Sequence, residues 1–165
     1  MIICGIDPGT RSTGYGILDI NATSTSGIRY IAHGAIKPAS RDMNARVKEI
    51  FIALTDILKL YRPSEVAVET SFYALNAQTA LKLGQIRGAI ILAPTLMDIP
   101  VFEYTPTEIK KATCGYGHAD KDQIHSMVNT ILNLPKGTVK SRDASDALAI
   151  GLCHTSSRRF RRLAT

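Results

Sequence analysis

Four carboxylates in this chain have neighbours and spacings that suit a shared chemical task. Asp7 ends the apolar run "MIICGI" and stands directly before a Pro8–Gly9 turn, and Glu69 ends the short apolar run "EVAVE". Asp143 and Asp146 are three residues apart, so on a helix they share one face. Functional crevices in open α/β sheets lie beyond the carboxyl ends of the strands, so we expect all four carboxylates to converge at one edge of a sheet.

Carboxylates held together in this way indicate a site for divalent cations. Their charges repel strongly unless cations neutralise them. Oxygen ligands with no histidine or cysteine beside them suit Mg²⁺ or Mn²⁺, and paired ions of this kind serve in-line displacement at phosphorus. Taken singly, Asp7 could cap a turn, Glu69 could end a surface strand and Asp143 could favour a helix N-terminus. The combination is what indicates chemistry on a phosphate.

The composition indicates one cytoplasmic domain with a bias toward nucleic acid. The chain has 165 residues, 45% of them hydrophobic, with a net charge of +6 and a pI near 9.4. Because it lacks a run of about 18 apolar residues and a basic start followed by an apolar stretch, we expect no membrane span and no signal peptide. Three cysteines without a CxxC spacing fit reduced thiols, and the basic excess favours polyanionic partners.

Hydrophobic periodicity predicts strands and helices in an α/β order. Strands are expected at 1–7, 14–20, 28–36, 65–69 and 101–104. Helices are expected at 41–60, 76–96, 106–112, 120–132 and 141–154, with Asp120 and Ser141 as caps. Three leading strands followed by alternating helices and strands predict a mixed sheet with helices on both faces.

Several small or basic residues leave alternatives open. Gly14 and Gly16 either allow a close backbone approach or serve the hairpin that contains them. Gly84 and Gly88 lie one turn apart on a predicted helix, where they either form a dimer interface or pack against the sheet. The arginines of the terminal run "RRFRR" either are solvated or contact nucleic acid.

The chain also resembles a known family. Bacterial RuvC Holliday junction resolvases are similar, in sequence and in order, to four segments that read "GIDPGTRSTGYG", "ETSFYALNAQTALKLGQIRG", "VFEYTPTEIKKA" and "SRDASDALAIG". The similarity runs from residue 2 to about residue 154. It implies an α/β fold with a ribonuclease-H-like mixed sheet flanked by helices. The implied nuclease domain spans residues 1–155, and a basic, flexible C-terminal tail follows at 156–165.

The resemblance implies a function as well. Members of the family are Mg²⁺-dependent homodimers that resolve four-way (Holliday) DNA junctions by paired symmetric nicks, through two-metal-ion phosphodiester hydrolysis. They act in homologous recombination and DNA repair, alongside the branch-migration complex of RuvA and RuvB. The resemblance therefore implies a cytoplasmic enzyme whose substrate is a four-way DNA junction.

The family's functional positions can be matched residue by residue. Its acidic positions match Asp7, Glu69, Asp143 and Asp146, which are expected to bind two Mg²⁺ ions for which Mn²⁺ substitutes. Its basic positions near the scissile phosphate match Lys110 and Lys121, and Lys121 is expected to act in catalysis. Its aromatic position at the junction crossover matches Phe72, so the expected DNA contacts are Phe72, Lys110 and Lys121.

Two other classes of function share part of this pattern. The run "GIDPGT" also resembles the phosphate loop of actin-like ATPases, which need two such domains around a nucleotide, whereas this chain has room for one. A catalytically silent nucleic-acid-binding module on the same fold is the second alternative. The loss of an acidic position would favour it, and all four positions are acidic here.

Overall fold

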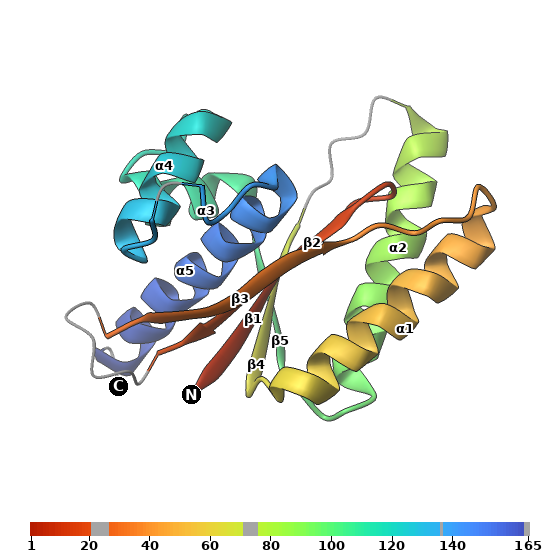
Figure 1. Cartoon of the computed structure of the whole chain (residues 1–165), viewed down its shortest axis with the longest axis horizontal. Helices are drawn as coiled ribbons and strands as arrows, with labels where there is room; N and C mark the ends of the chain where they lie inside the picture. Colours follow the sequence, from red (N-terminus) through yellow and green to blue (C-terminus); the bar gives the residue numbers. More distant parts are fainter. Residues whose placement is uncertain (21–26, 71–75, 136, 164–165) are drawn as a thin grey trace.

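One mixed sheet of five strands forms the centre of the molecule (Figure 1). The computed structural model describes residues 1–20, 27–70, 76–135 and 137–163, with backbone alone from residue 159. The strands are β1 (Ile2–Asp7), β2 (Thr13–Asp19), β3 (Arg29–Ile36), β4 (Glu65–Glu69) and β5 (Val101–Tyr104), in the order β3-β2-β1-β4-β5. The first three are antiparallel neighbours, while β1, β4 and β5 run parallel. The predicted mixed sheet is confirmed.

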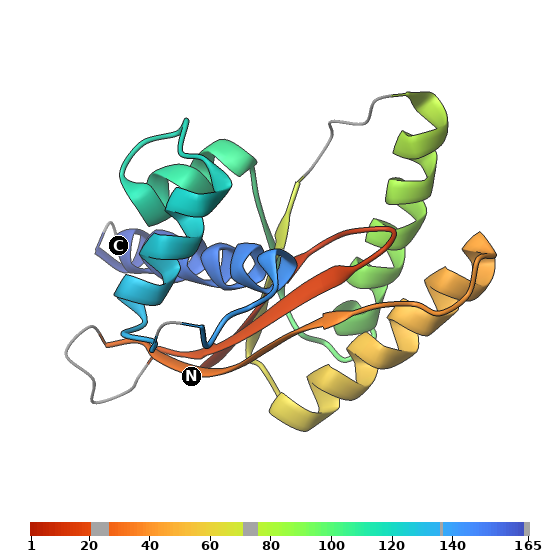
Figure 2. The ribbon, with the colours of Figure 1, turned by 45° about the horizontal axis from the view of Figure 1, so that its top comes forward.

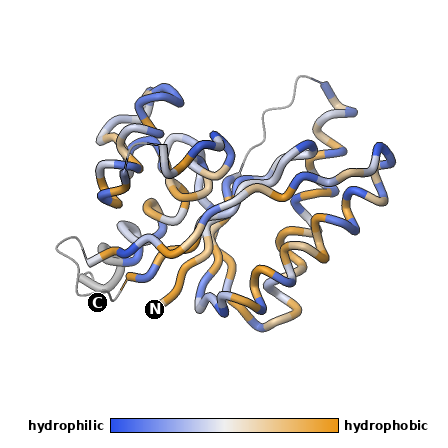
Figure 3. Tube along the Cα trace, in the orientation of Figure 1, coloured by the Kyte–Doolittle hydropathy of each residue, from blue (hydrophilic) through white to orange (hydrophobic). Residues whose placement is uncertain are grey.

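Helices cover both faces of this sheet, as predicted. Figure 1 shows α1 (Met43–Tyr61) and α2 (Ala77–Thr95) on one side and α3 (Pro106–Cys114), α4 (Lys121–Ile131) and α5 (Arg142–Leu163) on the other. Two hydrophobic clusters fill the two interfaces, one between the sheet and α1 and α2, the other around α5. Figure 3 shows apolar residues along the central strands and polar residues at the ends of several helices. No helix in the described ranges combines the length and apolar character needed to cross a bilayer.

Local sequence signals set the ends of the short helices near the site. Thr105 and Glu108 form a capping box at the start of α3, and Gly115, with a positive φ of 84°, ends it. Asp120 accepts a hydrogen bond from the Gln123 backbone N–H, so it caps α4 as predicted. This cap makes Lys121 the first residue of α4.

Close packing of α5 on the β1–β2 hairpin depends on glycine. A Cβ atom at Gly14 would overlap the carbonyl oxygen of Asp143, and one at Gly5 would overlap the carbonyl oxygen of Ala147. Gly14 also pairs with Asp7 across the two strands. The backbone that carries Asp143 therefore lies directly against the strand pair that carries Asp7, which decides the open question about Gly14 in favour of close approach.

The substitution Gly14→Ala is expected to push α5 away from the sheet. A methyl group has no room beside the Asp143 carbonyl, so we expect the free energy of unfolding to fall by about 1–3 kcal/mol. Because the same shift separates Asp143 from Asp7, we expect the nuclease activity that the resemblance implies to fall more than the loss of folded protein explains. Thermal melting and activity per folded molecule, measured below the melting temperature, check this. Parent-like stability and activity would show that the helix does not need this contact.

A polar network anchors the far part of α5. His154 is buried, its Nε2 lies 2.6 Å from Glu65 Oε2, and its Nδ1 lies 2.8 Å from the Tyr104 hydroxyl. Arg158 Nε donates to both oxygens of Glu65, at 3.1 and 3.0 Å. The segment expected as a tail from residue 156 continues α5 as far as Leu163, and no break in the helix marks residue 155.

Candidate active site

A cavity of about 440 Å³ lies at the edge of the sheet where β1 and β4 end. The two strands are parallel neighbours, with Ile6 opposite Val68, so the residues that follow, Asp7 and Glu69, lie at the same edge. Figure 2 shows the end of β4 rising between the group α3, α4 and α5 and the group α1 and α2. The strand ends thus place two carboxylates on the wall of the cavity.

The first turns of α5 bring the other two carboxylates to the same cavity. Asp143 and Asp146 both line it, on the helix face that the three-residue spacing predicted. The close approach of α5 to Gly14 is what carries them to Asp7. All four acidic positions that the sequence singled out therefore share one cavity.

Electrostatic repulsion and burial both act on Asp7. Desolvation is the larger cause that raises the pKa of its carboxyl group, to about 8, and the charges of Glu69 and Asp146 add to it. Lys121 opposes this shift, and Asp143 adds to it. A carboxyl group with so high a pKa is mostly protonated at neutral pH, so the cluster carries fewer than four negative charges there.

Metal-free protein should show the burial of Asp7 and its repulsion by neighbouring carboxylates as a pH-dependent stability. The pKa of Asp7 is about 8 in the folded chain, against an ordinary 3.8, so the folded state binds more protons than the unfolded state between about pH 4 and pH 8. The free energy of unfolding therefore falls as the pH rises through that window. Each pKa unit corresponds to about 1.4 kcal/mol.

We expect Asp7→Asn to remove this dependence. In EDTA at pH 8 the variant should be more stable than the parent by about 2 kcal/mol or more, with little difference at pH 4. Chemical denaturation at the two pH values checks the expectation. A variant that is equally or less stable than the parent at pH 8 would mean that burial and neighbouring charges do not destabilise the ionised Asp7 carboxyl group.

The four carboxylates of the cavity are suitable ligands for hard divalent cations, although their side chains are not arranged around a common point. Within the described residues, no group of three or more His, Cys, Asp or Glu side chains stands ready to hold a metal ion. The four carboxylates nevertheless line one cavity and supply oxygen atoms alone, the ligands preferred by Mg²⁺ and Mn²⁺. The raised pKa of Asp7 indicates a cluster that cations would stabilise.

The two lysines predicted from the sequence also line the cavity, on α3 and α4. Lys121 Nζ lies 3.2 Å from Asp146 Oδ2, and this charge is the main cause that raises the pKa of Lys121. Lys110 lines the same cavity from α3. Phe72 lies outside the described residues, so its expected stacking on a junction base stays a prediction.

The turn after Asp7 was predicted at Pro8–Gly9, but the contributions of Ser12 and Thr13 to it were not. The buried Thr13 hydroxyl donates to the Gly9 carbonyl oxygen at 3.0 Å and so closes the turn between β1 and β2. Gly9 and Ser12, from that turn, line the cavity. The spacing of Gly9 and Thr13 is a weak signal, because threonine hydroxyls often bond to nearby backbone.

Comparison with known proteins agrees with this geometry. The family model described as crossover junction endodeoxyribonuclease RuvC matches residues 3–154. The RuvC protein of Citrifermentans bemidjiense is 48% identical over 160 residues, which cover 95% of this chain and 93% of that protein. The Thermus thermophilus RuvC structure is 32% identical, with a TM-score of 0.86, and covers 98% of this chain and 97% of its own.

A second solved structure adds information about a substrate. Thermus thermophilus RuvC in complex with a Holliday junction substrate matches with a TM-score of 0.87 at 32% identity, over 98% of this chain and 96% of that one. These matches confirm the predicted ribonuclease-H-like fold. The matched family model covers nearly the whole region that the four sequence segments span. The chain belongs to the RuvC family of crossover junction endodeoxyribonucleases.

Proposed function

We propose that this protein is a Mg²⁺-dependent endodeoxyribonuclease that resolves four-way DNA junctions by paired symmetric nicks. The observation that carries the proposal is the gathering of four carboxylates and two lysines in one cavity at the carboxyl edge of the sheet, in a chain of this family. The junction complex of the Thermus thermophilus relative supports the substrate class. The complete acidic set argues for an active nuclease over a silent nucleic-acid-binding module.

The carboxylates and the lysines of the cavity have different proposed roles. Asp7, Glu69, Asp143 and Asp146 would hold two Mg²⁺ ions, for which Mn²⁺ substitutes. When bound, such ions supply a water molecule of lowered pKa and stabilise charge on the phosphate oxygens. Hydrolysis at a phosphodiester then leaves a 5′-phosphate and a 3′-hydroxyl.

The two lysines serve the phosphate itself. Lys110 and Lys121 place positive charge on the cavity wall, where they attract the scissile phosphate and its neighbours. Lys121 also fixes Asp146 through their ion pair, so it both orients a metal ligand and offsets negative charge in the transition state. These roles explain why basic side chains lie beside a carboxylate cluster.

Two symmetric nicks need two active sites, which a C₂ homodimer supplies. The outer face of α2 is our candidate interface. Leu81, Leu92 and Leu96 are 68%, 49% and 66% exposed there, and a Cβ atom at Gly84 or Gly88 would meet no described atom within 4 Å. These glycines therefore do not pack against the sheet, and the small and apolar residues leave a face on which a second copy can lie closely.

A charge on this face is expected to separate the dimer. Leu92→Glu should sediment as a monomer at micromolar concentration. Its fold should be retained, with a single cooperative melting transition, because the side chain is half exposed. Leu60→Glu, with a 71% exposed leucine near the end of α1, is the matched control and should sediment as the parent does. A Leu92→Glu protein that remains dimeric would place the interface elsewhere.

The cellular setting follows from the proposed activity. A junction-resolving nuclease acts in homologous recombination and DNA repair, in the cytoplasm, and follows branch migration by RuvA and RuvB. These roles rest on the family and on the substrate of the proposed reaction.

A supercoiled plasmid that extrudes a cruciform tests the paired nicks. One nick relaxes the plasmid and reabsorbs the cruciform, so linear product requires two nicks within the lifetime of one complex. We expect linear plasmid as the main product with Mg²⁺ and no product in EDTA. Nicked circles alone would contradict paired resolution.

A further inference from the structure

Outside the cavity, the structure gathers basic side chains at the tip of the β1–β2 hairpin. Arg46 on α1 joins two segments that are far apart in the sequence, because its Nε donates to the Ser40 carbonyl oxygen at 2.7 Å and its Nη1 to the Thr10 carbonyl oxygen at 3.2 Å. One guanidinium group thus holds the hairpin turn beside the segment that leads into α1. Arg11 follows Thr10, and Arg41 follows Ser40, so the two exposed arginines are held near each other.

Strand pairing brings a third cation to the same place. Thr13 of β2 pairs with Ile36 of β3, and the exposed Lys37 directly follows Ile36. We call Arg11, Lys37 and Arg41 the basic rim. The rim borders the candidate active site, because Gly9 and Ser12 of the same turn line the cavity.

The segment that carries Arg41 is fixed by α1. Glu49 accepts hydrogen bonds from the backbone N–H groups of Ala39, at 2.7 Å, and Ser40, at 3.3 Å. Asp42 caps the helix by accepting from the Ala45 N–H at 2.8 Å. The carboxylates of Glu49 and Asp42 therefore bind backbone N–H groups, and these hydrogen bonds hold the backbone beside Arg41 in place.

The charges of the basic rim have no ionic partners in the described part of the chain. The ion pairs among those residues include neither the rim nor Arg46. Arg46 uses its Nε and Nη1 groups on carbonyl oxygens, so its charge adds to that of the rim. Exposed cations held together without ion-pair partners suit an anionic partner that runs along the surface.

We propose that the basic rim binds backbone phosphates of the DNA next to the scissile phosphate, and that Arg46 positions it for this task. The inference rests on the proposed function, because the rim would guide a strand into the nuclease cavity. Contacts of this kind fix the register of the DNA and carry no sequence information. They should appear in the salt dependence of binding, since each neutralised phosphate adds about 0.9 to the slope of log K against log salt concentration.

Two charge-matched double variants test the proposal. Arg11→Gln with Arg41→Gln removes two charges from the rim. Lys59→Gln with Arg62→Gln removes two exposed charges from the opposite end of α1, where no ion pair is lost within the described residues. Binding of a fluorescent four-way junction is measured in EDTA from 50 to 300 mM NaCl, after thermal melting has shown that both proteins fold.

We expect the rim variant to lower the magnitude of the salt slope by about two and to bind at least tenfold more weakly at the lowest salt concentration. The control variant should keep the parent slope. Equal slopes for the two variants would overturn the inference. Because binding is measured without metal, this result is independent of cleavage: a parent that cleaves junctions while the slopes are equal refutes the rim alone, whereas a parent that binds through the rim but never cleaves refutes the proposed function.

Discussion

Asp7→Asn is expected to lower the rate of junction cleavage by about 10³-fold or more while leaving junction binding in EDTA unchanged or tighter. The expected loss follows from the removal of a proposed metal ligand, since metal ions contribute several kcal/mol to stabilising the transition state and each 1.4 kcal/mol is a factor of ten. Binding should not suffer, because the asparagine adds no charge to the cavity, and above about pH 8, where Asp7 ionises, it removes a negative charge that repels the DNA backbone.

Single-turnover cleavage and binding to the same junction separate these two effects. Asp56→Asn, on the exposed face of α1, is the matched control and should behave as the parent does in both measurements. Glu69→Gln, Asp143→Asn and Asp146→Asn are expected to reproduce the Asp7→Asn result, because all four side chains line the same cavity. Cleavage by Asp7→Asn at close to the parent rate would contradict the assignment of the metal site.

Lys121→Ala should cleave about 10²-fold more slowly and bind the junction almost normally. The Lys121 Nζ atom lies 3.2 Å from Asp146 Oδ2, so its removal would free a proposed metal ligand and leave the transition-state charge less well balanced. A residue that serves ground-state binding alone would instead weaken the complex and lower the salt slope by about one.

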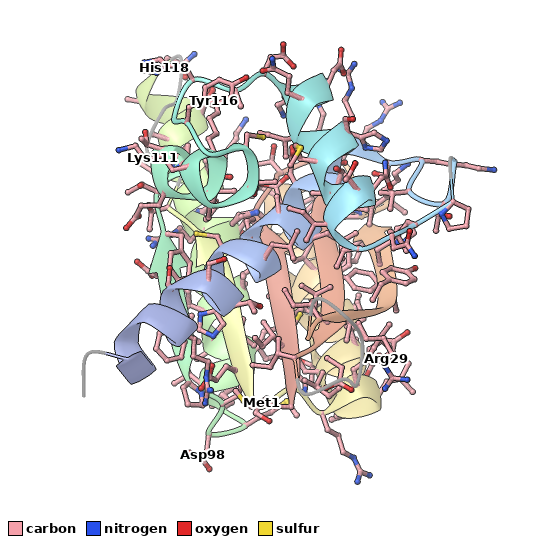
Figure 4. The ribbon with its side chains drawn as sticks, turned by 90° about the vertical axis from the view of Figure 1, so that its left-hand side faces the viewer. Met1, Arg29, Asp98, Lys111, Tyr116 and His118 are labelled. Atoms are coloured by element: carbon pink, nitrogen blue, oxygen red, sulfur yellow. The ribbon has the colours of Figure 1, made fainter. Side chains whose placement is uncertain are left out.

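Lys111→Ala provides the comparison for this variant. Lys111 is exposed on α3 and does not line the cavity, and Figure 4 places it near the α3–α4 loop that carries Tyr116 and His118. We expect parent-like cleavage from Lys111→Ala in single-turnover measurements. Unchanged cleavage by Lys121→Ala would remove Lys121 from the catalytic groups.

Much of this fold could be predicted from hydrophobic periodicity and from the polar residues that end strands and cap helices. The strand at Glu65–Glu69 and the strand at Val101–Tyr104 are found at their predicted positions. Both are short apolar runs with clear polar boundaries, and α4 starts behind a capping aspartate as expected. Local sequence patterns are sufficient to predict an element when the residues that stabilise it are close to one another in the sequence.

The parts that escaped prediction depend on contacts between distant segments. Nothing in the sequence tells that Gly14 faces the backbone of Asp143, or that Arg46 reaches Thr10 across 36 positions. The contact between buried His154 and partly buried Glu65 joins residues 89 positions apart, so no local pattern marks it. Arg158 of α5 donates to Glu65 across 93 positions, a contact that a terminal basic run does not reveal.

The convergence of the four carboxylates could be predicted only in part from the sequence. The sequence supplied the strand ends and the shared helix face, and the sheet order then brought β1 and β4 together. The depth at which α5 approaches them is set by glycines whose role was ambiguous in the sequence. The electrostatic consequence, a pKa of about 8 for Asp7, could be obtained only once the burial of this side chain was known.

The central claim is most directly tested by incubating the full-length protein with a synthetic four-way junction and, separately, with a linear duplex built from the same sequences. Each substrate is labelled on all strands and treated under single-turnover conditions with Mg²⁺ or with EDTA. The account predicts nicks at symmetric positions on two opposing strands of the junction with Mg²⁺, no product in EDTA, and an uncut duplex in both. Equal cleavage of the duplex, or cleavage of the junction in EDTA, would contradict it.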